Sequence, residues 1–251
     1  MSGIFYSSGA DATELRPLWE DAFGADRGSL SCLSGAMRSK DRIYTARETD
    51  GRLGGFFFSF SLQTQGQKGF YIYGLCTRRD LRGRGIMREL IRHGADGEAA
   101  RGASFALLIP ANEALRETYR KMGFSLPVPV GAAADPKAAE DYYGTLEGTF
   151  PTLPFDGDFE RLWSLSGGVL SREAFRFALA TLSDTTDLQY LTRDGQTPQG
   201  YLLGYAGKRG HLWATSPSLA PLVKGRRHEA LAMPLSGACP LLTYGLEPLP
   251  R

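Results

Sequence analysis

The stretch that decides the fold is Phe70-Tyr71-Ile72-Tyr73-Gly74-Leu75-Cys76, then Thr77-Arg78-Arg79-Asp80-Leu81, then Arg82-Gly83-Arg84-Gly85-Ile86-Met87. Its aromatic and β-branched start is typical of a buried strand. Gly83 and Gly85 lack the Cβ atoms that would keep an anion away from the backbone. Apolar residues then recur at helical spacing up to Ile91. The pattern predicts a strand, an anion-binding turn and a helix whose first N–H groups face the turn.

Two common nucleotide-binding motifs do not fit this turn. Arg88 stands where a dinucleotide fingerprint needs its third glycine, and no Lys-Ser or Lys-Thr pair follows as a nucleoside triphosphate loop requires. For an isolated Arg-Gly-Arg-Gly sequence, a solvated loop without a ligand is the alternative to an anion site. The residues downstream of the turn therefore have to decide between the two.

Composition excludes several classes of protein. The 251 residues suffice for one large domain or two smaller ones, and 42% of them are hydrophobic, enough for a packed core. The formal net charge is +2, so overall charge favours neither nucleic acid nor a membrane surface as partner. Cys32, Cys76 and Cys239 are too few and too scattered for a disulfide framework or a zinc site, which favours a cytoplasmic location and no metal. Without a leader-like start or a run of about 18 apolar residues, we expect neither secretion nor membrane spanning.

A short strand, a helix and a hairpin are expected ahead of the opening stretch. Residues 4–7 predict the strand, and Asp11 with Glu14 has the spacing of a capping box. An apolar stripe follows, which predicts a helix packed on a sheet; it consists of Leu15, Leu18, Trp19, Ala22 and Phe23. Residues 42–48 and 53–62, joined by Asp50-Gly51, predict an antiparallel hairpin. Between helix and hairpin, residues 28–39 are rich in Gly and Ser, and a mobile lid is one interpretation of them.

A second strand and helix are expected after the opening stretch. The helix that starts at the turn should span residues 84–101, followed by a buried strand at 103–109 and a helix at 113–122 that stops at Gly123. Strand, helix, strand and helix in succession predict a parallel strand pair. Ligands bind where such a pair opens at its carboxyl ends.

Two motifs together resemble the GNAT acyltransferase superfamily. One is the stretch 77–87, and the other comprises Pro110-Ala111-Asn112-Glu113-Ala114 with Tyr119-Arg120-Lys121-Met122-Gly123-Phe124. The superfamily signature is Arg or Gln, two residues, Gly, one residue, then Gly or Ala, and it maps onto Arg82, Gly85 and Met87. Met87 departs from the last position in a way that is similar to tandem-GNAT acetyltransferases of the enhanced-intracellular-survival type. The resemblance implies an α/β (α+β) GNAT fold with a mixed central sheet.

The resemblance also implies acetyl-coenzyme A as the cofactor. Its pyrophosphate would be held by the backbone N–H groups of Gly83, Arg84, Gly85, Ile86 and Met87, with charge from Arg82 and Arg84. Hydrogen bonds to a charged group contribute roughly 1.5 to 3 kcal/mol each, so several amides and a helix end can hold a diphosphate without a metal. Leu75, Cys76 and Thr77 would pair with the pantetheine amides as an added strand does.

Two further residues take roles from the same resemblance. Asn112 would contact coenzyme A, and Tyr119 would protonate the leaving thiolate. Asn112 is alternatively the N-cap of its helix, and both roles are compatible. The alternative for Tyr119 is a core aromatic residue. Cys76 is interpreted as a small apolar strand residue rather than a nucleophile, because no His lies near it in sequence.

The base that takes a proton from the attacking amine is not identifiable in the sequence. Glu20, Asp21, Glu48 and Glu113 are the carboxylates considered, and each is interpreted as a solvated surface charge. In tandem GNAT enzymes the terminal carboxylate can reach the first active site. The residue in that place here is Arg251.

Residues 151–251 are expected to form a smaller, degenerate GNAT-like domain after an acetyl-coenzyme A domain at residues 1–150. Residues 151–157 are interpreted as a linker, and residues 187–193 echo residues 41–47. Lys224-Gly225-Arg226-Arg227 lacks a second loop glycine, so the coenzyme site looks lost in this half. Residues 229–235 and 241–246 are expected to be strands of the smaller lobe. An unrelated small α+β domain is the alternative.

The sequence thus predicts an N-acetyltransferase that acts on an amine of a small molecule or peptide. A non-catalytic acyl-coenzyme A sensor is the second hypothesis. Nucleic-acid binding through the arginines near the turn is a third, opposed by the near-neutral remainder of the chain and the lack of an aromatic stacking pattern.

Overall fold

The computed structural model describes residues 3–24, 42–64, 66–133, 145–146, 152–165, 171–173, 175–176, 186–192, 194–205, 208–214, 223–224 and 226–236. The chain divides into two compact units. The first comprises Met1–Pro127, Ala230–Pro240 and Arg251, and the second comprises Val128–Glu229 and Leu241–Pro250.

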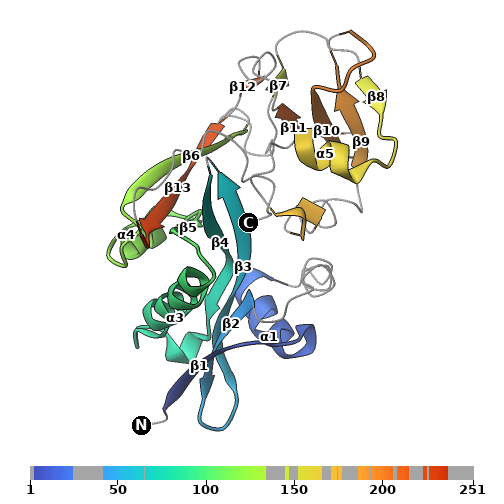
Figure 1. Ribbon diagram of the computed structural model, residues 1–251. Helices are drawn as coiled ribbons and strands as arrows, with labels where there is room; N and C mark the ends of the chain where they lie inside the picture. The colour runs from blue at the N-terminus through green and yellow to red at the C-terminus, as the bar shows by residue number, and fades with distance from the viewer. Residues whose placement is uncertain are drawn as a thin grey trace. The chain divides into compact units, whose positions relative to one another are not determined.

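A seven-stranded sheet in the order β1-β2-β3-β4-β5-β13-β6 includes all described strands of the first unit (Figure 1). The strands are β1 (Ile4–Ser8), β2 (Ile43–Glu48), β3 (Leu53–Thr64), β4 (Gln67–Thr77), β5 (Phe105–Leu108), β13 (Arg226–Pro234) and β6 (Leu126–Ala133). Strands β1 to β4 are antiparallel neighbours, whereas β4 and β5 are parallel. The predicted hairpin, the parallel pair and the mixed central sheet are confirmed.

Helices α1 (Ala12–Phe23) and α3 (Ile86–Ala100) cover opposite faces of this sheet (Figure 1). Successive side chains of a strand point to opposite faces of the sheet, so neighbouring residues of β3 contact different helices. Phe56 and Phe58 of β3 contact Trp19 of α1, whereas Phe57 lies against Gly94 of α3. A side chain at Gly94 would collide with the Phe57 ring, so this glycine allows α3 to lie close to the sheet.

Helix α1 begins as predicted. The Asp11 side chain accepts a hydrogen bond from the Glu14 N–H at 3.0 Å, and the Glu14 carboxylate accepts one from the Asp11 N–H at 3.4 Å. This reciprocal capping box satisfies two N–H groups that the helix leaves unpaired. The stripe behind it buries Leu15, Leu18 and Trp19, but Phe23 at its end is 41% exposed.

A buried carboxylate fixes the carboxyl end of α3. Glu98 is 2% exposed and accepts hydrogen bonds from Ser59 Oγ at 2.8 Å, from Arg42 Nη1 at 3.0 Å and from the Tyr44 hydroxyl at 3.1 Å. A buried charge is tolerated only when it is paired and hydrogen-bonded. The network therefore ties the last turn of α3 to β2 and β3.

Strand β13 corrects the expected place of residues 229–235. Its residues Leu231–Pro234 pair antiparallel with Phe105–Leu108 of β5, so the strand belongs to the first sheet and not to a smaller lobe. Ala230, Leu231 and Ala232 are fully buried. The sequence identifies such a segment as a strand but does not name its partner, since pairing is decided by contacts distant in sequence. The compact units accordingly do not follow the expected boundary after residue 150, and the degenerate character of the second unit stays a prediction.

The second unit contains a four-stranded sheet in the order β11-β10-β9-β8. Its strands are β8 (Thr152–Pro154), β9 (Thr186–Leu191), β10 (Gly200–Tyr205) and β11 (Lys208–Ala214), and helix α5 spans Phe159–Leu165. The short strands β7 (Thr145–Leu146) and β12 (Val223–Lys224) form a separate pair. The linker expected at 151–157 is wrong in part, because Thr152–Pro154 pairs with β9. The expected lid at 28–39 and the strand at 241–246 lie outside the described residues.

Candidate active site

The parallel pair β4 and β5 opens where the sequence predicts a ligand. Only Gly69–Tyr71 of β4 pair with Phe105–Leu107 of β5, although β4 continues to Thr77. Beyond Tyr71, the β4 edge that faces β5 carries backbone groups that do not pair with that strand. Such an edge can accept an extended ligand with peptide-like amides, as the sequence predicts for Leu75, Cys76 and Thr77.

A β-bulge changes the direction of β4 in the part beyond Tyr71 that does not pair with β5. Phe56 and Phe58 of β3 stand opposite Cys76 and Tyr73, so β4 holds one more residue than β3 between these pairs. The extra residue is accommodated at Gly74, whose φ is 63°. Sequence reasoning missed this bulge, although a glycine inside a strand pattern is its usual signal.

The turn after β4 leaves its glycines open. Gly83 and Gly85 have φ values of 75° and 78°, and a Cβ atom at either would meet nothing within 4 Å. Gly85 is the N-cap of α3 and offers no side-chain hydrogen bond to the first turn. The first N–H groups of α3 therefore face open space with the positive end of the helix dipole behind them.

Arginine side chains with uncommitted donors gather at the same turn. Arg82 uses Nε to donate to the Thr77 carbonyl at 3.0 Å. The exposed Arg84 and Arg88 form no hydrogen bond or ion pair within the part of the chain that the structure describes. Cations near a helix N-terminus, and like charges four residues apart, are unfavourable by a few tenths of a kcal/mol or more. A bound anion would remove this cost.

Helix α4 (Glu113–Arg120) carries the two remaining predicted residues. The Asn112 side chain accepts a hydrogen bond from the Leu115 N–H at 2.9 Å, so the N-cap interpretation of Asn112 is confirmed. Contact of Asn112 with a coenzyme stays a prediction. Tyr119 belongs to the hydrophobic core cluster and meets Phe124 edge-on, with 6.1 Å between ring centroids.

Tyr119 and Cys76 are both buried. Burial, with a smaller contribution from Cys76, raises the pKa of Tyr119 to about 12. Burial also raises the pKa of the Cys76 thiol far above its ordinary value. The phenol and the thiol are thus both protonated at neutral pH, which disfavours Cys76 as a nucleophile.

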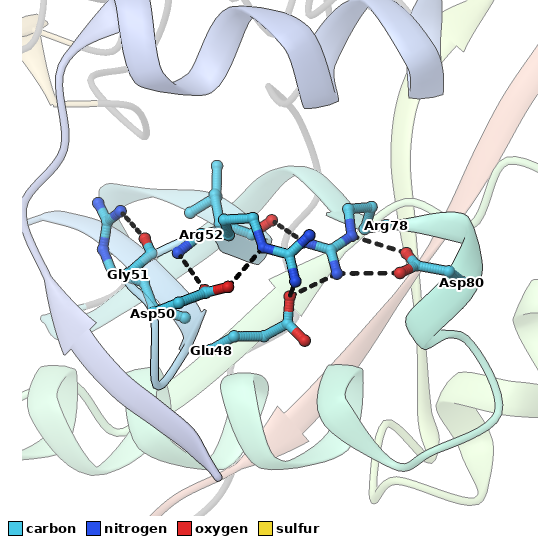
Figure 2. Close-up of polar contacts among 8 residues, drawn as sticks. Glu48, Asp50, Gly51, Arg52, Arg78 and Asp80 are labelled. Carbon is cyan, nitrogen blue, oxygen red and sulfur yellow. Dashed lines mark hydrogen bonds and ion pairs between the residues drawn. The ribbon is translucent and has the colours of Figure 1, made fainter. Parts of the chain in front are cut away.

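The carboxylates considered as bases differ from one another. Glu48, expected to be solvated, is only 7% exposed and accepts a hydrogen bond from Arg78 at 2.5 Å (Figure 2). This expectation was wrong because the last residue of β2 looks like a loop edge in sequence, whereas the folded hairpin covers it. Asp21 pairs with Arg79 at 3.0 Å. Glu113, 74% exposed, is a surface charge as expected.

The described residues contain neither a metal-ligand cluster nor a membrane-spanning helix. Within the residues described, no group of three or more His, Cys, Asp and Glu side chains could hold a metal ion. None of the described helices is long and apolar enough to cross a membrane.

A family model matches most of the first unit. Residues 12–124 match the model of the Acetyltransferase (GNAT) family. No curated protein matches the sequence.

Solved structures share the fold over nearly the whole chain. A GCN5-related N-acetyltransferase from Anabaena variabilis is 16% identical with a TM-score of 0.59, and the match covers 93% of this chain and 66% of that one. One from Kribbella flavida is 15% identical with a TM-score of 0.59, covering 93% of this chain and 71% of that one. A Pyrococcus horikoshii protein is 15% identical with a TM-score of 0.58, covering 95% of this chain and 91% of that one. This chain therefore spans just under two thirds of the Anabaena protein, and the likeness extends beyond the family match.

Proposed function

We propose that this GNAT domain is an acetyl-coenzyme A dependent N-acetyltransferase that acts on an amine of a small molecule or a peptide. The observation that carries the proposal is the open glycine turn at the N-terminus of α3, beside the unpaired edge of β4. A diphosphate fits the turn, and an amide-containing arm fits the strand edge. Coenzyme A combines these two chemical features in one molecule.

Tyr119 is the group we assign to protonation of the leaving thiolate. An amine attacks the thioester carbonyl, the C–N bond forms, and the C–S bond breaks to release the coenzyme thiolate. A phenol with a pKa of about 12 is protonated at neutral pH, as an acid must be. It is a weak acid toward an ordinary thiolate. A coenzyme thiolate released in a similarly buried setting would also be a stronger base than in water, because burial disfavours the charged form.

The base remains open within this proposal. Glu48 forms an ion pair with Arg78, Asp21 with Arg79 and the exposed Glu113 with Arg116. This leaves the half-buried Glu20, whose carboxylate has no hydrogen-bond or ion-pair partner among the described residues. The terminal carboxylate at Arg251 lies outside the described residues and stays a prediction.

The test is a free-thiol release assay with acetyl-coenzyme A and a panel of polyamines, aminoglycosides, amino acids and peptides, run beside calorimetry with coenzyme A. We expect coenzyme A to bind and at least one amine to be acetylated, with the product identified by its added mass. Absence of coenzyme A binding would contradict the assignment. Tight binding without turnover on any amine would favour the alternative, a non-catalytic acyl-coenzyme A sensor, for which the unassigned base is the supporting observation.

A further inference from the structure

We propose that Glu48, Arg78 and Asp80 form a clasp that positions the anion-binding turn for the coenzyme (Figure 2). This inference rests on the proposed function. None of the three residues belongs to the predicted coenzyme contacts. They are positioning residues that act through the backbone of residues 82–87.

Arg78 directly follows the last residue of β4 and connects the strand to the turn. Its Nη2 donates to Glu48 Oε2 at 2.5 Å and to Asp80 Oδ2 at 2.9 Å, while Nε donates to Asp80 Oδ1 at 2.6 Å. Its Nη1 donates to the Leu53 carbonyl at 3.2 Å, and its backbone N–H donates to the Gly54 carbonyl at 2.8 Å. All three guanidinium nitrogens are therefore engaged, and the direction in which the chain leaves β4 is fixed.

Glu48 anchors the clasp to strand β2. It is the last residue of β2, 7% exposed, and also lies 3.4 Å from Arg52 (Figure 2). A carboxylate this buried requires its cationic partners, because an uncompensated buried charge is strongly destabilising. The hairpin therefore holds the Arg78 side chain in one orientation at the point where the chain enters the turn.

Asp80 transmits that orientation to the turn. It lies in the short 3₁₀ helix η2 (Arg79–Leu81), 63% exposed, and binds the Arg78 fork through both carboxylate oxygens. The next residue, Leu81, is 2% exposed and lies against Gly54. Residues 78–82 are consequently fixed on both the polar and the apolar side.

The second half of the turn has no such fixation. Gly83 and Gly85 adopt positive φ and have open space around them. Their N–H groups can point in a defined direction only if the chain enters the turn in a defined direction. Because hydrogen bonds weaken steeply with misalignment, small errors at the entrance reduce coenzyme affinity.

The experiment compares two buried carboxylates of the same domain in the full-length chain. Glu48→Gln removes the charge that anchors the clasp. Glu98→Gln removes a carboxylate of similar burial, 2% exposed and 3.0 Å from Arg42, at the opposite end of α3. Coenzyme A affinity is measured by calorimetry, thermal unfolding gives Tm, and steady-state kinetics give kcat and KM.

We expect Glu48→Gln to weaken coenzyme A binding by about tenfold and to raise KM for acetyl-coenzyme A while kcat at saturation is kept, as misplacement of a binding group predicts. Glu98→Gln should lower Tm and leave the affinity unchanged. Asp80→Asn, at a position that is 63% exposed, should weaken binding by about threefold. Arg78→Lys keeps the positive charge but loses the planar guanidinium that binds two partners. Its affinity for coenzyme A should therefore lie between those of the wild type and Glu48→Gln.

The outcomes separate the two proposals. If the wild-type chain does not bind coenzyme A, the proposed function fails. If it binds, and Glu48→Gln lowers Tm as Glu98→Gln does while the affinity stays within twofold of wild type, the clasp is merely structural and this inference alone fails. Should Glu48→Gln not fold, unchanged affinity in both Asp80→Asn and Arg78→Lys overturns it.

Discussion

The two ends of α3 differ in how their charged groups are satisfied. At the closed end, defined by Arg42, Tyr44, Ser59 and Glu98, a buried carboxylate has several donors around it. At the open end, defined by residues 82–87 with Cys76 and Tyr119, the glycines face empty space and the arginines keep uncommitted donors. The strands repeat the contrast, because β4 and β5 are paired near the closed end and unpaired beyond Tyr71.

The difference separates stability from function. Groups that are paired within the chain contribute to folding, whereas positive charges left beside a helix N-terminus cost stability. Natural proteins tolerate such costs where a ligand or a reaction requires them. Substitutions at the closed end should therefore change stability, and matched substitutions at the open end should change coenzyme binding or turnover.

The largest expected effect is on turnover. Tyr119→Phe should lower kcat by about 10²-fold or more, since it removes the general acid. Tyr44→Phe is the matched control at the closed end, because Tyr44 is also buried with a pKa raised to about 12. It should affect stability and leave kcat unchanged. Full turnover in Tyr119→Phe would remove the acid assignment.

The pH dependence of the wild type checks the same residue. The pKa of Tyr119 is raised from 10.0 to about 12, so the protonated acid persists as pH rises and is lost only near pH 12. We therefore expect no decline in kcat assignable to this group between about pH 7 and 10. A decline in kcat at high pH with a midpoint near pH 10 would indicate a phenol whose pKa is not raised.

Coenzyme binding should show the next largest effect. Gly85→Glu places an anion and a strained left-handed residue in the turn, and we expect roughly 100-fold weaker coenzyme A binding from the loss of about two charge-assisted hydrogen bonds. Gly102→Glu is the control, because Gly102 follows the closed end with φ of 90° and similar open space. Calorimetry showing equal losses in both variants would contradict a site at the turn.

A substitution at the closed end should lower the stability of the fold. Glu98→Gln exchanges a buried carboxylate for an uncharged amide that cannot neutralise Arg42, and we expect a loss of about 2 kcal/mol in the free energy of unfolding. Urea titration measures this loss. A variant as stable as the wild type would show that the closed end contributes no net stability.

The smallest effect concerns the cap of α4. Asn112→Ala should lower the free energy of unfolding by about 1 kcal/mol, and Asn112→Ser should restore it because serine also caps helices. Calorimetry with coenzyme A on the serine variant then isolates any contact of Asn112 with the coenzyme. Serine failing to restore stability would contradict the capping role.

Local patterns in the sequence predicted most of the elements that form the site. The capping box at Asp11, the aromatic strand β4, the glycine turn and the parallel pair with β5 all follow from residues close together in the chain. The Gly74 bulge was missed because its signal is a single residue. Glu48 was misjudged because burial depends on what the rest of the chain covers.

The sequence by itself determined where an anion can approach the backbone, since Gly83 and Gly85 lack side chains whatever surrounds them. It also placed Tyr119 on the helix that follows β5. Only the tertiary structure decided that β13, more than a hundred residues beyond β5, pairs with it. The structure alone also brought Glu48 to Arg78 across 30 positions in sequence. Pairing and burial depend on contacts between distant segments, and no local pattern specifies those partners.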